Sequence, residues 1–197
     1  MLVRDPRFLP WIAIFAFLIA GLGVFAEQVN PWLDYREADI RAGQWWRLAT
    51  SHLVHINLWH MAMNLAGFLL CCYFFTDIYT RRIFVAWLGC APVLGILFLL
   101  FDDMPGSYAG LSGLLHGWLV LALVAGFRGH PWLHGLVLAL VSGRLIWEQM
   151  PGYDVDYLRD YIDASVHVNA HLYGAFLGLL IGLFLYWRRQ DGRASRG

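Results

Sequence analysis

The sequence predicts an all-α membrane protein, a single domain over residues 1–197 built as a bundle of six transmembrane helices. Hydrophobic residues make up 59% of the chain and charged residues only 14%, whereas about a quarter of a soluble domain is charged. About six apolar stretches approach the roughly 20 residues that a helix needs to cross a bilayer. Only short polar segments separate most of these stretches, and no soluble domain, linker or low-complexity tract is apparent. Together these observations favour a compact polytopic membrane protein.

The expected spans follow one another along the whole chain. They are Phe8–Ala26, His55–Phe75, Ile83–Phe101, Leu111–Phe127, Pro131–Met150 and Val166–Trp187. The first has a basic start and small residues near its end, as a signal peptide does, but it is long for one. Its removal would leave an odd number of spans, so we expect it to be retained.

The connections between the spans are polar. The longest runs from Glu27 to Val54, and an acidic one runs from Pro151 to Ser165. The aspartates of the acidic loop do not have the spacing of an EF-hand, so we expect a solvated loop rather than a calcium site. These aspartates are Asp154, Asp156, Asp160 and Asp163.

The arginines predict the orientation, because cytoplasmic loops carry an excess of basic residues. With the loops assigned alternately to the two sides, one side holds Arg36, Arg41, Arg47 and Arg159, with Arg144 near a helix end. The opposite side holds Arg4, Arg7, Arg81, Arg82, Arg128, Arg188, Arg189, Arg193 and Arg196. Both termini are therefore expected in the cytoplasm, and the Ser112 end of its helix is expected to face outward.

Composition also excludes one class of partner. The formal net charge is zero, and no basic face exists outside the short C-terminal tail, so we expect no nucleic-acid partner. The three cysteines, Cys71, Cys72 and Cys90, lie in apolar runs and are interpreted as small buried hydrophobic residues.

Ser112 and His171 are the main candidates for chemistry. Polar side chains within a membrane are costly and usually functional. A serine hydroxyl becomes a nucleophile only when a base lies within hydrogen-bond reach. Glycines spaced by four residues let helices approach closely in lipid, and such stripes lie beside both residues: Gly113 and Gly117 in one span, and Gly174, Gly178 and Gly182 in the other. If the stripes meet, they bring His171 toward Ser112; the alternative is simple helix packing with an incidental serine.

His60 and Asn64 are expected to share one face of the second span. They are four residues apart, and therefore about 40° apart around a helix. Two hydrogen-bonding side chains one turn apart can point at a common oxygen, as donors to the oxyanion of an acyl-transfer reaction do. The alternative is a polar cluster that joins helices. His55 lies about 140° from His60 on the same reckoning, so it is expected at the helix mouth.

A metal or haem site is the competing chemical interpretation. His60, His116 and His171 could together ligate zinc, and two histidines could ligate haem in a bundle. However, the sequence has no HExxH motif, and no acidic residue is apparent within a span near these histidines. We therefore expect neither a metal nor a cofactor.

Three separated motifs resemble those of the rhomboid family of intramembrane serine proteases. His55-Ile-Asn-Leu-Trp-His60-Met-Ala-Met-Asn64 resembles the His-x4-His-x3-Asn pattern of the family's second span. Gly110-Leu-Ser112-Gly113 resembles its Gly-x-Ser-Gly nucleophile motif. Ala170-His171-Leu-Tyr-Gly174-Ala-Phe-Leu-Gly178 resembles its sixth-span pattern. The Trp46-Arg47 pair is similar to the Trp-Arg pair of the family's long first loop.

The resemblance implies a role for each matching residue. Ser112 would be the nucleophile and His171 its general base, in a dyad without a third acidic member. The Ser112 backbone N–H, His60 and Asn64 would bind the oxyanion, and Trp46 and Arg47 would shape the first loop. His55 would order water or the loop near the mouth of the site. The substrate would be a transmembrane protein that enters laterally from the lipid.

One position departs from the common family pattern. Four residues after the serine, where many rhomboids carry a tyrosine that stacks on the catalytic histidine, this chain has His116. In this it is similar to the rhombosortase branch, whose members are thought to process bacterial surface proteins with a Gly-Gly segment, a span and a basic tail. The resemblance thus implies a bacterial inner membrane, with the active site opening to the periplasmic side.

The fifth span is a lateral gate in the family, and its outer end here carries Arg144, Trp147 and Glu148. Arg144 and Glu148 are four residues apart and can form an ion pair. We expect an interfacial ion pair beside a membrane-belt aromatic rather than a substrate-recognition site. The main alternative for the whole chain is an inactive rhomboid-like protein that only binds membrane clients.

Overall fold

The fold is described here from a computed structural model that covers residues 7–103, 106–153 and 166–194, with side chains as far as Arg188. Over these ranges the chain is helical, with no strand. One isolated antiparallel bridge joins Tyr35 to Tyr108. The acidic loop residues Asp154, Asp156, Asp160 and Asp163 lie outside the described residues, and so do the side chains of Arg4, Arg159, Arg189, Arg193 and Arg196.

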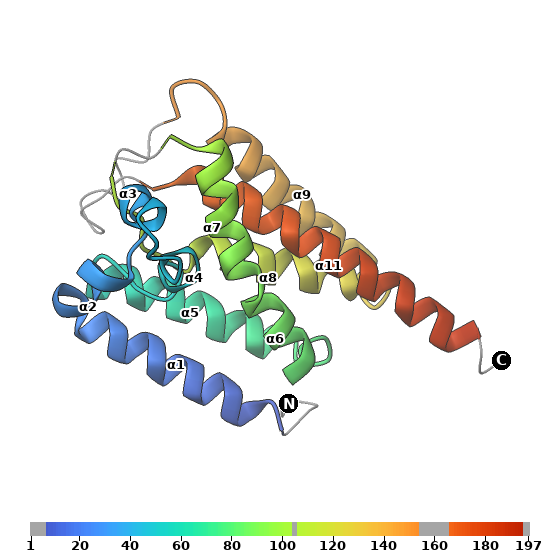
Figure 1. The fold of residues 1–197 in the computed structure, drawn as a ribbon. Coiled ribbons are helices and arrows are strands. Elements are labelled where there is room, and N and C mark those ends of the chain that lie inside the picture. The colour runs from blue at the N-terminus through green and yellow to red at the C-terminus, as the bar shows by residue number, and fades with distance from the viewer. Residues whose placement is uncertain (1–6, 104–105, 154–165, 195–197) are drawn as a thin grey trace.

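Each of the six apolar stretches is helical (Figure 1). Five are single helices: α1 (Leu9–Val24), α5 (Leu58–Phe74), α8 (Ser112–Ala125), α9 (Pro131–Glu148) and α11 (Val168–Ala194). The third stretch is divided into α6 (Arg81–Leu88) and α7 (Cys90–Phe101). Pro92 explains this division, because proline lacks a backbone N–H and its ring crowds the carbonyl four residues earlier.

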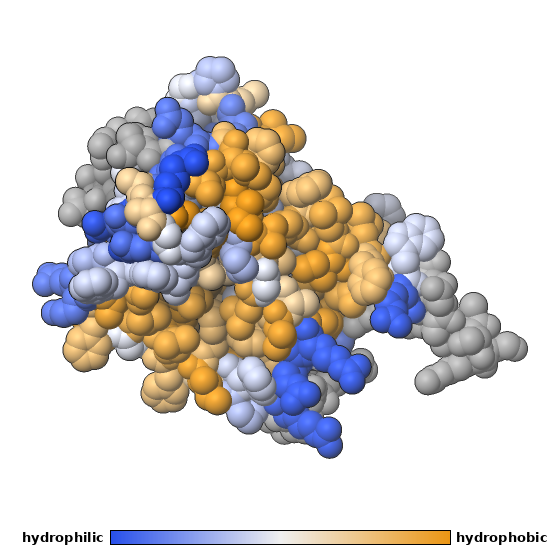
Figure 2. All heavy atoms as spheres, viewed as in Figure 1, coloured by the Kyte–Doolittle hydropathy of each residue, from blue (hydrophilic) through white to orange (hydrophobic). Residues whose placement is uncertain are grey.

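Length and apolar composition alone identify fewer membrane spans than expected. Residues 81–101 and 168–188 are long and apolar enough to cross a membrane, and α1 with α2 (Ala26–Leu33) makes a third if this pair, bent by 102°, is one span. The apolar helices α5 and α8 are shorter. Figure 2 shows a broad band of hydrophobic side chains between hydrophilic groups on either side of it. Six membrane crossings therefore remain a prediction.

The polar segment between α1 and α5 contains short helices and is ordered around one buried arginine. These helices are α2, α3 (Glu37–Arg41) and α4 (Arg47–Thr50). Arg47 is 2% exposed, and its guanidinium donates to the carbonyls of Pro31 and Asp34, each at 2.7 Å, and to the Asp34 carboxylate at 2.8 Å. Such charge-assisted bonds are stronger than neutral ones. Arg47 thus fixes the path of this segment, which packs on α7 where Leu48 meets Gly95.

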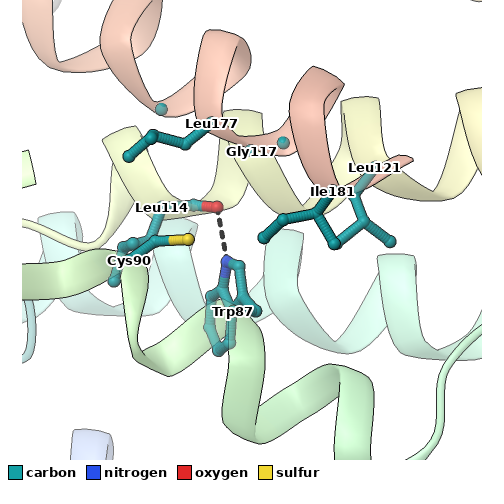
Figure 3. A pocket seen from close by; sticks show the side chains of 9 residues that line it. Trp87, Cys90, Leu114, Gly117, Leu121, Leu177 and Ile181 are labelled. Atoms are coloured by element: carbon teal, nitrogen blue, oxygen red, sulfur yellow. Dashed lines mark hydrogen bonds between the residues drawn. The ribbon is translucent and has the colours of Figure 1, made fainter. Parts of the chain in front are cut away.

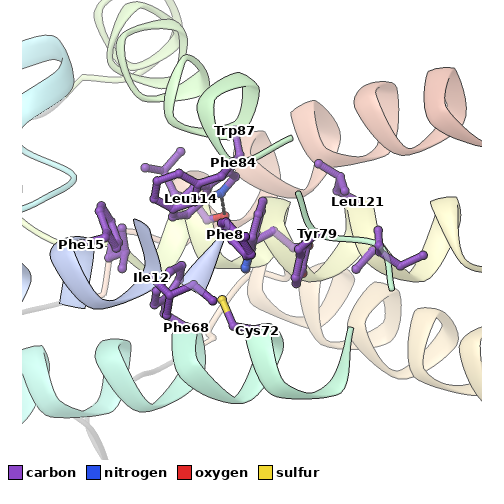
Figure 4. Close-up of a cluster of buried hydrophobic side chains, with 14 of the residues drawn as sticks. Phe8, Ile12, Phe15, Phe68, Cys72, Tyr79, Phe84, Trp87, Leu114 and Leu121 are labelled. Atoms are coloured by element: carbon purple, nitrogen blue, oxygen red, sulfur yellow. Dashed lines mark hydrogen bonds between the residues drawn. The ribbon is translucent and has the colours of Figure 1, made fainter. Parts of the chain in front are cut away.

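An aromatic core joins α1, α5, α6 and α8 (Figure 4). Its centre is Trp118, which stacks on Tyr79 with ring centroids 3.6 Å apart. The Tyr79 hydroxyl donates to the Trp118 carbonyl at 2.7 Å, and the Trp87 indole N–H donates to the Leu114 carbonyl at 2.8 Å (Figure 3). The polar atoms of these two large side chains are therefore satisfied by the backbone of α8, which fixes that helix in place.

The glycine stripes of α8 and α11 meet, as the sequence predicts. A Cβ on Gly178 would overlap the carbonyl oxygen of Gly117, and a Cβ on Gly174 would overlap that of Gly113. A Cβ on Gly117 would lie only 2.5 Å from the carbonyl oxygen of Gly174. The two helices therefore touch backbone to backbone, an approach that residues with side chains would prevent.

We predict that Gly178→Ala destabilises the protein by about 1–3 kcal/mol, since the methyl group would meet backbone that cannot rotate away. The unfolding temperature of the detergent-purified variant measures this effect. Gly143→Ala in α9 is the matched control, because its Cβ would meet nothing within 4 Å. Equal unfolding temperatures of the two variants would contradict the glycine contact.

Candidate active site

Ser112 and His171 lie in direct contact although they are far apart in the sequence. The Ser112 hydroxyl Oγ is 3.0 Å from His171 Nε2. Ser112 is the first residue of α8, and His171 lies in the first turns of α11. The backbone contact along the glycine stripes sets this distance, because a serine side chain is too short to bridge two ordinarily spaced helices. A serine hydroxyl bonded to an imidazole nitrogen is the geometry of an activated nucleophile.

Gly110 and Gly113 flank Ser112, and neither position has room for a side chain because another helix lies too close. A Cβ on Gly110 would lie 2.9 Å from Cε1 of His60, and a Cβ on Gly113 would lie 2.8 Å from the carbonyl oxygen of Ala170. Real Cβ atoms essentially never approach another heavy atom this closely. Gly110 thus lets the histidine of α5 reach the start of α8, and Gly113 lets α11 do so from the other side.

His116 stacks on His171. The two rings have centroids 4.1 Å apart with 22° between their planes. His116 Nδ1 lies 2.9 Å from the carbonyl oxygen of Ser112, which fixes the His116 ring one turn after the serine. One face of the His171 ring is therefore covered, and its rotation is restricted.

The expectation that no carboxylate lies near the histidines is wrong. Glu148, the last residue of α9, places Oε2 2.9 Å from His171 Nδ1. Its other oxygen, Oε1, accepts a hydrogen bond from Arg144 Nε at 2.9 Å. The expected Arg144–Glu148 ion pair therefore exists, but its carboxylate also contacts the candidate base. The sequence contained a usable indication: consecutive antiparallel helices place the end of one beside the start of the next.

His60 and Asn64 lie on the face of α5 that packs against α8. Gly67 follows them on this face, where an added Cβ would lie 3.4 Å from Cδ1 of Leu115 on α8, and Asn64 is only 5% exposed. The Asn64 side-chain amide donates to the His60 carbonyl at 3.0 Å. An amide nitrogen carries two N–H groups, so the second can still donate to a substrate.

His55 precedes α5, at the mouth of the helix, and its ring contacts that of His60. The ring centroids of the two histidines are 5.1 Å apart, edge to face. The reason is that α5 begins only at Leu58, where the Asn57 side chain caps it by accepting from the His60 N–H at 2.9 Å. Residues before Leu58 do not follow helical spacing, so the separation of about 140° does not apply to His55.

Trp46 and Arg47 belong to the first loop and not to the group around Ser112. The Trp46 indole N–H donates to the Trp32 carbonyl at 2.9 Å, while Arg47 makes the buried bonds described above. Both side chains therefore join α4 to the residues around α2.

A second buried carboxylate, which the sequence gave no reason to single out, anchors the start of α11. Asp102 follows α7 and accepts hydrogen bonds from the Asn169 amide and the Tyr173 hydroxyl, each at 2.8 Å. His167 Nε2 lies 2.8 Å from its other oxygen. His171 lies between these partners in the sequence, so Asp102 helps to hold the helix that carries it.

The histidines are not grouped as a metal site. In residues 7–103, 106–153 and 166–194, no three His, Cys, Asp or Glu side chains are arranged to hold a metal ion. His116 and His171 are stacked face to face, an arrangement that does not direct two ring nitrogens at one ion.

The comparisons with known proteins agree with the motifs. The model of the rhomboid domain matches residues 42–188, well over half of the chain. The comparison with curated proteins finds no match. The matched range begins in the first loop and includes Ser112, His171, His60 and Asn64. The chain therefore belongs to the rhomboid family, whose members include intramembrane serine proteases.

Proposed function

We propose that the protein is an active intramembrane serine endopeptidase that cleaves a single-span membrane protein within or near its transmembrane segment. The observation that carries this proposal is the 3.0 Å contact between Ser112 Oγ and His171 Nε2. The contact joins two apolar helices, where an unneeded polar pair would be costly. Glycines on both helices make this contact possible, so the helix packing supports the same dyad that the chemistry requires.

In the proposed reaction Ser112 Oγ attacks the scissile carbonyl carbon while His171 Nε2 takes the hydroxyl proton. The C–N bond then breaks, and the same proton passes from Nε2 to the leaving amine, which gives an acyl-enzyme. A water molecule, deprotonated by His171, hydrolyses the ester and restores the serine. No external cofactor is needed for this sequence.

The oxyanion of the tetrahedral intermediate would be stabilised by the Ser112 backbone N–H, the His60 side chain and the Asn64 side chain. The first N–H groups of a helix have no partner within the helix, and Ser112 begins α8. His60 lies beside Gly110, two residues before the serine. Preorganised donors of this kind are usually among the largest contributions to acyl-transfer catalysis.

Water and substrate must both reach the site. Ser112 and His171 lie at or near the start of their helices, which suits a site close to one membrane surface. A helical substrate hides its carbonyls in internal hydrogen bonds and must unwind before attack. The substrate would enter sideways from the lipid, with both termini of the enzyme in the cytoplasm and the site facing the opposite side.

The finer assignment is to the rhombosortase branch, in a bacterial inner membrane. His116 occupies the position that carries a tyrosine in many rhomboids, and its stacking on His171 supports the proposal that an imidazole takes the place of that ring. The substrate would then carry a Gly-Gly segment, one span and a basic tail.

Covalent labelling tests the proposed nucleophile. A fluorophosphonate probe should label the detergent-purified protein, with labelling abolished in Ser112→Ala and greatly reduced in His171→Ala, because attack on phosphorus needs the same activated hydroxyl. Ser142→Ala is the control and should label normally, since this serine is exposed on α9. Wild-type protein that remains unlabelled in native-like lipid, while a rhomboid protease control reacts, would favour an inactive client-binding member of the family.

The rate of the same labelling reaction tests the proposed oxyanion donors. Asn64→Ala should lower the maximal rate of phosphonylation by about 100-fold or more, because one preorganised donor is lost. Its unfolding temperature should change little, since the residue bonds mainly to its own helix. Met63→Ala truncates the neighbouring exposed side chain and should react at the wild-type rate. A rate within threefold of wild type in Asn64→Ala would remove this residue from the oxyanion site.

Cleavage of a model membrane protein tests the proposed substrate. In liposomes, a single-span reporter with Gly-Gly ahead of its span should be cleaved about tenfold faster or more than the Ala-Ala form. Each glycine makes a helix about 1 kcal/mol less stable than alanine does, so the segment unwinds more easily. Cleavage must be absent with Ser112→Ala enzyme. Equal cleavage of the two reporters would exclude the rhombosortase preference and leave the general protease assignment standing.

A further inference from the structure

Glu148 is a buried carboxylate that the proposed dyad does not require. Its side chain is 2% exposed, yet a carboxylate is costly to bury unless it is paired and hydrogen-bonded. Each of its oxygens has a different partner: Oε1 accepts from Arg144, and Oε2 lies 2.9 Å from His171 Nδ1. An ion pair between α9 residues alone could have formed at the surface, so the contact with α11 needs its own explanation.

The two nitrogens of His171 have opposite requirements. Nε2 must be unprotonated to accept the proton of Ser112, so in the neutral ring the proton must reside on Nδ1. An ionised carboxylate can only accept a hydrogen bond. With Glu148 Oε2 beside Nδ1, only the tautomer with its proton on Nδ1 satisfies both neighbours, and this is the tautomer that can act as a base toward the serine.

The surroundings keep Glu148 and His171 in this arrangement. The guanidinium of Arg144 on α9 balances the carboxylate charge, and it also donates to the hydroxyl of Tyr153, which follows α9. From α8, the His116 ring covers one face of His171. The imidazole is thus held by a ring on its face, a hydroxyl at one nitrogen and a carboxylate at the other.

We propose that Glu148 is a positioning residue for His171, so that α8, α11 and α9 together form a Ser–His–Glu triad. This inference rests on the proposed serine-protease function. When His171 takes the serine proton onto Nε2, its Nδ1 proton stays in the hydrogen bond to Glu148. The carboxylate remains ionised and stabilises the positive imidazolium until Nε2 gives its proton to the leaving amine. Carboxylates play this part in other serine hydrolases.

Glu148→Gln tests the proposal, with the rate of Ser112 phosphonylation by a fluorophosphonate as the readout. The amide keeps the shape but can donate to Nδ1 and so favour the wrong tautomer. We expect the maximal rate to fall by about 100-fold or more, with the half-saturating probe concentration nearly unchanged. A maximal rate within threefold of wild type would overturn the proposal.

Arg144→Gln is the matched control. It breaks the same Arg144–Glu148 ion pair but leaves Glu148 beside His171, so we expect less than a tenfold loss of maximal rate. Equal losses in Arg144→Gln and Glu148→Gln would mean that only the ion pair matters. If Glu148→Gln does not fold, the variant that carries both substitutions removes both charges. It should react at least about 100-fold more slowly than Arg144→Gln, and a difference within threefold would again overturn the proposal.

The His171→Ala background separates positioning from stability. A residue that acts only through His171 has no effect once that side chain is gone, because groups that act as a unit are non-additive. Glu148→Gln should therefore not reduce the residual rate of His171→Ala, and a further large reduction would assign Glu148 another role. Failure of the protease function itself would look different, since wild-type protein would then show no Ser112-dependent labelling.

Discussion

The backbone contact between α8 and α11 is the constraint on which the rest of the site depends. Gly113, Gly117, Gly174 and Gly178 leave no side chain between the helices, and a Cβ at any of them would crowd the carbonyl of the facing helix. Helices within a membrane gain little from hydrophobic association, so close van der Waals contact is a main source of their attraction. The same contact sets the distance between a short hydroxyl and an imidazole. Packing and chemical geometry are therefore two consequences of one glycine pattern.

Buried charges add hydrogen bonds to segments that an apolar cluster also joins, because Leu48 of the first loop, Phe98 of α7 and Ala170 of α11 pack together. Arg47 ties the first loop together through the carbonyls of Pro31 and Asp34. Asp102 ties the end of α7 to the start of α11 through Asn169 and Tyr173. Arg47 also forms a buried ion pair with the Asp34 carboxylate at 2.8 Å, and removing one partner of such a pair costs about 3–5 kcal/mol because the other charge is left uncompensated. These hydrogen bonds thus fix the positions of the first loop and of the start of α11, as the glycine contacts fix α8 against α11.

Much of this arrangement could be predicted from the sequence, because it depends on periodic patterns. The helices follow from long apolar stretches, and the meeting of Ser112 with His171 follows from glycines at the same spacing in both spans. Arg47 was harder to interpret, because its partners include the backbone carbonyls of Pro31 and Asp34, which no side-chain pattern reveals. The contact between the His55 and His60 rings was not predicted, because helical spacing does not apply to His55, which precedes the first residue of α5, Leu58. Glu148 was overlooked because its pairing with Arg144 at a four-residue spacing already appeared to explain it.

The three side chains of the proposed triad are held in two different ways. The backbones that carry Ser112 and His171 are fixed by the glycine contact, which side-chain rotation cannot loosen. Glu148 lies on α9, where Gly143 faces open space and where packing on α8 and α11 involves side chains such as Val120, Leu145 and Ala175. The carboxylate therefore reaches His171 through rotatable side-chain bonds, and its hydrogen bond from Arg144 restricts their rotation. Removing it should leave the serine and the histidine in contact, because the feature that places them does not involve α9. The dyad is thus a property of the glycine interface, and the carboxylate adds control over which nitrogen of His171 carries the proton.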